Sequence, residues 1–116
     1  MNCTSIECVE KEARSFLSGL GFNSNFQIVF SPDLTAEYSY FDKNKNIIYI
    51  NLFKYTNLYN EWSGEAGLVS TFLFILIISS FLIENGYSLN NLEDIILKKF
   101  GENSIEYLVF KYIFNK

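Results

Sequence analysis

The longest apolar stretch of the chain lies between Glu65 and Glu84. Residues 66–83 include no charged side chain, and about 18 apolar residues is the lower limit for a membrane-spanning helix. Such helices usually end in basic or aromatic residues, whereas acidic residues flank this one on both sides. A helix that is apolar all round is also typical of the centre of a core. We therefore favour a buried central helix, which would carry four hydroxyl side chains, and keep a single membrane span through residues 66–83 as the alternative. The hydroxyl residues are Ser70, Thr71, Ser79 and Ser80.

Before this stretch, the hydrophobic pattern changes from helical to alternating. Apolar residues at helical spacing predict a first helix that begins with a capping box at Thr4 and Glu7 and ends at Gly19 and Gly21. Alternation then predicts a small sheet, whose third strand is apolar on both faces and is therefore expected either at its centre or with one face covered by another element. The segments are strands at 26–31, 36–41 and 47–53, a polar hairpin loop at 42–46, and a further loop at 54–61.

After the central helix, the pattern is helical to the end of the chain. Asn85-Gly86 predicts its end. Ser88 is expected to cap a helix over 89–100, and Asn103 with Glu106 is expected to cap a last helix that runs to Phe114. Strands followed by helices indicate an α+β fold in one domain, 1–116. The expected order is an N-terminal helix, a small three-stranded mainly antiparallel sheet, a long buried central helix and two C-terminal helices.

Composition narrows the possible functions. With 49% hydrophobic residues in 116, the chain can form a core without metals or disulfides. Its net charge is −4 and Arg14 is the only arginine, so a basic face for nucleic acid is not expected. The sequence contains no histidine, the commonest general base and zinc ligand. We predict no cofactor and no metal.

Two cysteines, Cys3 and Cys8, lie near the N-terminus. No second pair completes a zinc site, and the sequence leaves open whether the two are bonded to each other. The first twenty residues are amphipathic rather than continuously apolar, unlike a signal peptide. The expectation is therefore a reducing, cytoplasmic location.

The order of elements resembles the smallest zincin-like metallopeptidase domains, in which a sheet ending in a hairpin precedes a long active-site helix. The similar stretches are Ala36–Asp42, Asn46–Leu52 and Leu68–Glu84. In that family the helix carries His-Glu-x-x-His, which binds zinc and polarises a water molecule. Here the corresponding position reads Phe74-Ile75-Leu76-Ile77-Ile78. The resemblance thus implies a degenerate zincin-like scaffold that has lost its metal site.

One pair of acidic residues is a candidate for catalysis. Glu61 and Glu65 are four residues apart on either side of Trp62, and are expected at the start of the central helix. Paired carboxylates can act as acid and base when burial raises the pKa of one of them. Two solvated acids at a helix N-terminus are the ordinary alternative. A hydrolase using this pair is accordingly a lesser hypothesis.

Tyrosines gather on the predicted hairpin and the loop after it, and tyrosine is enriched at protein interfaces. By strand spacing, Tyr38 and Tyr40 are expected on the same sheet face. The sequence therefore predicts a non-catalytic protein-binding or structural protein, such as an inhibitor, an adaptor or a homo-oligomeric scaffold. Its partner would be another protein or a second copy in a homodimer. The predicted interface residues are Tyr38, Tyr40, Tyr49, Tyr55 and Tyr59.

Overall fold

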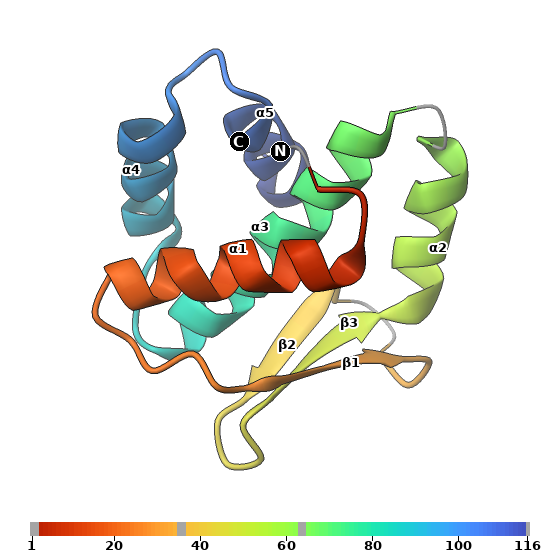
Figure 1. The fold of residues 1–116 in the computed structure, drawn as a ribbon, viewed down its shortest axis with the longest axis horizontal. Helices are drawn as coiled ribbons and strands as arrows, with labels where there is room; N and C mark the ends of the chain where they lie inside the picture. Colours follow the sequence, from red (N-terminus) through yellow and green to blue (C-terminus); the bar gives the residue numbers. More distant parts are fainter. Residues whose placement is uncertain (1–2, 35–36, 63–64, 116) are drawn as a thin grey trace.

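A single long helix, α3 (Ala66–Glu84), runs through the middle of the fold, and the other elements pack around it (Figure 1). The computed structural model describes residues 3–34, 37–62 and 65–115. The remaining elements are α1 (Ile6–Gly19), β1 (Gln27–Ser31), β2 (Ser39–Asp42), β3 (Ile47–Asn51), α2 (Leu52–Glu61), α4 (Leu89–Phe100) and α5 (Ile105–Phe114). The predicted α+β fold is confirmed, with its N-terminal helix and C-terminal helices.

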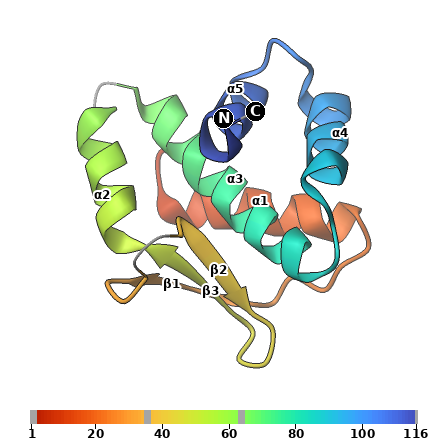
Figure 2. The same ribbon diagram turned by 180° about the vertical axis from the view of Figure 1, so that it is seen from behind.

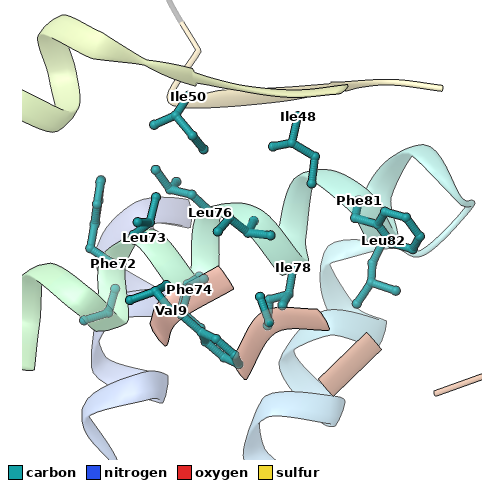
Figure 3. Close-up of a cluster of buried hydrophobic side chains, with 14 of the residues drawn as sticks. Val9, Ile48, Ile50, Phe72, Leu73, Phe74, Leu76, Ile78, Phe81 and Leu82 are labelled. Atoms are coloured by element: carbon teal, nitrogen blue, oxygen red, sulfur yellow. The ribbon is translucent and has the colours of Figure 1, made fainter. Parts of the chain in front are cut away.

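Helix α3 is the core of the structure. Every side chain from Phe72 to Ile78 is at most 2% exposed. Figure 3 shows Ile48 and Ile50 pointing from β3 toward one side of α3, while Phe74 and Ile78 lie on the other side near Val9 of α1. In the described part of the chain, Gly67–Glu84 is the one segment long and apolar enough to cross a membrane, and 78% of it is buried within the fold. The predicted buried central helix is confirmed.

The sheet is mixed, with strand order β1-β3-β2. The apolar strand β3 is central, as its sequence predicted, and pairs parallel with β1 and antiparallel with β2. The expectation of a mainly antiparallel sheet therefore holds only for the β2–β3 hairpin. Helix α3 covers one face of the sheet, and both ribbon views show the helices on that side (Figure 2). No helix of the described chain covers the opposite face.

The largest difference from the sequence-based prediction follows β3. Residues expected to form the end of a strand and a loop form the helix α2 instead. Asn51 ends the strand and caps this helix, because its side chain accepts a hydrogen bond from the backbone N–H of Lys54. Leu58 is buried and Tyr55 is partly buried, so one helical face contacts the core. The polar Asn and Thr residues between them obscured this periodicity.

Smaller corrections concern strand and helix ends. Strand β2 begins at Ser39, three residues later than predicted, and Ala36 lies outside the described residues. Ser5 rather than Thr4 caps α1, and Ser104 rather than Asn103 caps α5. In both cases a serine follows the predicted cap directly, and its side chain accepts from the backbone N–H three residues on.

Cys3 and Cys8 form a disulfide, which the sequence left open. The bond ties the segment before α1 to the first turn of that helix, and Cys3 is buried in the core. Disulfides persist mainly in oxidising compartments. The predicted cytoplasmic location stays a prediction, and this bond does not favour it.

Candidate functional site

The principal candidate site is a groove of about 460 Å³ between the edge of the sheet and the helices α3 and α5. We call it the β2 groove. In the view of Figure 2, β2 lies in front of α3 and below α5. Its three sides come from different parts of the chain: Glu37 to Phe41 from β2 and the residues before it, Leu76, Ser79, Ser80, Ile83 and Glu84 from α3, and Ile113 and Phe114 from α5.

One wall of the groove is a strand edge that pairs with no further strand among the described residues. Strand β2 is the last in the order β1-β3-β2. The backbone N–H of Asn51 donates to the carbonyl of Tyr38, 2.8 Å away, and alternate residues of an antiparallel strand face the same neighbour. The backbone N–H and C=O groups of Tyr40, which is paired with Tyr49, therefore also point toward β3. Ser39 and Phe41 then direct their backbone N–H and C=O groups away from β3, toward the open edge.

The floor of the groove is apolar but contains hydroxyl groups. The Ser80 hydroxyl donates to the backbone carbonyls of Leu76 and Ile77. The Ser39 hydroxyl donates to the same Leu76 carbonyl across the gap between β2 and α3. Ser79 is 2% exposed, and its hydroxyl has no hydrogen-bond partner among the described residues. An unpaired buried hydroxyl costs about 1–3 kcal/mol, so this position is not optimised for stability.

The two ends of the groove contain different charged residues. At one end, Glu37 precedes Tyr38, and the ammonium group of Lys54 lies 4.6 Å from the centre of the Tyr38 ring. Burial raises the pKa of Tyr38, and the nearby Tyr112 and Glu61 raise it further. At the other end lies Glu84, which is exposed and is the last residue of α3.

The five predicted interface tyrosines do not form one surface. Tyr38 packs edge-on against Phe72 in the core, at 5.4 Å between ring centres. Tyr40 and Tyr49 are paired on the uncovered face of the sheet. The expectation that Tyr38 and Tyr40 share a face is therefore wrong, because β2 begins only after Tyr38. That any of these residues bind a partner stays a prediction.

The remaining two tyrosines belong to α2. Tyr55 packs against Phe30, and its ring centre is 6.5 Å from that of Tyr59. Both line a smaller pocket of about 280 Å³, whose other walls include Val69, Leu73 and the disulfide-bonded segment at Cys3. Burial raises the pKa of Tyr55, with a smaller contribution from Tyr59.

The candidate acid pair is divided between two helices. Glu61 is the last residue of α2, and Glu65 directly precedes α3 without a side-chain hydrogen bond to its first turn. The expectation that both begin the central helix is wrong, because Glu61 still belongs to the helix that the sequence analysis missed. Both residues are exposed. Trp62, expected between them, packs against Phe72 and Tyr112. The geometry gives this pair no enclosed site.

The residues that could hold a metal are also dispersed. Within the described ranges, no three His, Cys, Asp or Glu side chains are grouped as metal ligands. Phe74 to Ile78, where the resemblance to zincins would place the metal-binding motif, are entirely buried in the core.

The β2 groove was not predicted from the sequence. Ser79 and Ser80 were visible as polar residues in an apolar helix, but nothing local indicated which of the two would be unpaired.

No family model, no curated protein and no solved structure matches this chain.

Proposed function

We propose that this chain is a non-catalytic protein-binding protein that accepts an extended segment of its partner in the β2 groove. A single observation carries the proposal: an unpaired strand edge runs beside an apolar floor. Addition of a strand to an open sheet edge is a common way for proteins to recognise peptides. Main-chain hydrogen bonds to the edge supply affinity, and pockets for alternate side chains supply specificity.

The edge and the floor have complementary roles in this proposal. Ser39 and Phe41 offer two N–H donors and two carbonyl acceptors to an added strand. Every second side chain of that strand would point toward Leu76 and Ile83 of α3. Ile83 is 41% exposed although it is apolar, so a partner side chain would remove it from water.

A proline at the edge tests the proposal directly. Ser39→Pro removes an N–H that does not bond β3, and proline is tolerated in edge strands when its nitrogen faces outward. Ser39→Ala is the matched control, because it removes the same hydroxyl bond to Leu76 but keeps the N–H. The probe is a library of blocked, fluorescently labelled hexapeptides that alternate Thr with Val, Ile, Leu or Phe, measured by fluorescence anisotropy.

We expect members of this library to bind the natural protein and Ser39→Ala, and to bind Ser39→Pro about two- to tenfold more weakly, which corresponds to the loss of one hydrogen bond. Circular dichroism establishes that both variants are folded. Equal binding by the two variants would refute strand addition at this edge.

Self-association through the uncovered sheet face is a second candidate, favoured by a row of apolar residues there. Val29, Tyr49 and Tyr40 are direct neighbours across the three strands, and Val29 and Tyr40 are 38% and 40% exposed. Two copies could pack these rows together as a homodimer. Light scattering should then give the mass of two chains for the natural protein and of one chain for Tyr40→Asp. A monomer at all concentrations would remove this candidate.

A further inference from the structure

We infer that the segment bound in the β2 groove carries a Lys or Arg side chain, and that Glu84 recognises this cation. The inference rests on the proposed function, because it requires a peptide in the groove. It adds the chemical class of the partner: an extended, basic peptide segment.

The negative end of the groove has two sources of charge. Glu84 is the last residue of α3, and the C-terminus of a helix carries a partial negative charge that favours cations and disfavours acids. The last turn of α3 contains no basic residue. An acid at this position adds to the helix dipole instead of offsetting it.

Glu84 forms no ion pair with a cation among the described residues. Lys98 and Lys99 lie in the last turn of α4, where their positive charges interact favourably with the dipole of that helix. Neither forms an ion pair with Glu84 in the described structure. Asn85 donates to the carbonyl of Phe81 and satisfies one of the terminal carbonyl groups of α3, but it brings no charge. The carboxylate of Glu84 is thus available to a partner.

The opposite end of the groove has a cation beside it. Lys54 lies over the Tyr38 ring, but Glu37 lines the same end and Glu61 also lies near that ring. The described lining of the groove contains two acids, Glu37 and Glu84, and no Lys or Arg, and Glu84 lines it next to the exposed Ile83. A bound strand would place an apolar side chain on Ile83 and a basic side chain directly beyond it.

The test is a double-mutant cycle between protein and peptide. The probes are blocked hexapeptides that alternate Thr with Ile or Val and end in Lys or in Gln, made with this residue at either terminus because the strand direction is not fixed. The protein variant is Glu84→Gln. Glu12→Gln is the matched control, because this substitution removes the same charge from the protein. Glu12 is exposed on α1 and does not line the groove.

We expect the natural protein to bind the Lys peptide about two- to fivefold more tightly than the Gln peptide at low salt, the range for an exposed ion pair. This preference should disappear in Glu84→Gln, persist in Glu12→Gln and shrink as salt is added.

The other outcomes separate failure of the inference from failure of the proposed function. If both peptides bind equally and Ser39→Pro abolishes binding, the inference is wrong and the proposed function stands. A preference for Lys that survives in Glu84→Gln also overturns the inference, because the cation is then recognised elsewhere. If no peptide binds the natural protein, the proposed function fails and the inference fails with it.

Discussion

Replacing Ser79 with alanine should stabilise the protein, although the residue lies in the middle of its most buried helix. The Ser79 side chain is 2% exposed, and its hydroxyl has no partner among the described residues. Water would satisfy this group in the unfolded chain, so folding forfeits its hydrogen bonds. Ser79→Ala removes that penalty.

The magnitude follows from two contributions. An unsatisfied buried hydroxyl costs about 1–3 kcal/mol, and alanine has a higher helix propensity than serine by roughly 0.5 kcal/mol. Loss of one oxygen atom leaves a small void, which offsets part of this gain. We expect the free energy of unfolding to rise by about 1–2 kcal/mol, and Tm to rise by roughly 4–8 °C.

Ser80→Ala is the matched control, one residue along the same helix. Ser80 donates to the carbonyl of Leu76 at 2.8 Å and to that of Ile77 at 3.2 Å. Loss of this pairing, about 0.5–1.5 kcal/mol, offsets the gain in propensity, so little net change is expected. The assay is urea unfolding followed by circular dichroism. If Ser79→Ala is no more stable than Ser80→Ala, the Ser79 hydroxyl is paired and the description of the groove floor is wrong.

Three further predictions concern the disulfide, an ionisable side chain and two glycines. Reduction of the Cys3–Cys8 bond should lower the free energy of unfolding by about 2 kcal/mol, because the loop it closes is short; equal urea midpoints with and without reductant would contradict this. Burial raises the pKa of Tyr55 in the folded state. The stability that this pKa difference contributes is complete below about pH 10 and is lost as the pH rises toward the folded-state pKa. Between about pH 9 and 12, the free energy of unfolding should therefore fall less for Tyr55→Phe than for the natural protein. Gly86→Ala should destabilise by about 1–2 kcal/mol because the φ of Gly86 is +95°, whereas Gly19→Ala, at the helical end of α1 with open space around it, should be neutral or stabilising by up to about 1 kcal/mol; similar melting temperatures for the two variants would refute the argument from φ.

The sequence predicted those parts of the fold that depend on local periodicity. The central helix, the first helix and α4 with its Ser88 cap follow from apolar spacing and capping residues alone. The central place of β3 also followed from its two apolar faces, although α3 covers only one of them and Tyr49 lies on the uncovered face of the sheet.

The features that the sequence did not predict depend on contacts between distant residues. Helix α2 was missed because Asn51 can end a strand or cap a helix, and only the packing of Leu58 against the core decides between them. The groove was missed for a similar reason. That β2 lies at an edge depends on the parallel pairing of β1 with β3, which joins segments about twenty residues apart. The lack of a partner for Ser79 depends on how α3 faces β2.

The central claim is that the edge of β2 accepts an added strand, and amide hydrogen exchange at Ser39 and Phe41 tests it most directly. In the free protein the amide of Tyr40, which faces β3, should exchange slowly, while those of Ser39 and Phe41 should exchange quickly because they point to the open edge. Saturation with the Lys-containing hexapeptide should protect Ser39 and Phe41 and leave Tyr40 unchanged. Slow exchange at Ser39 and Phe41 in the free protein, or no added protection with bound peptide, would contradict the claim.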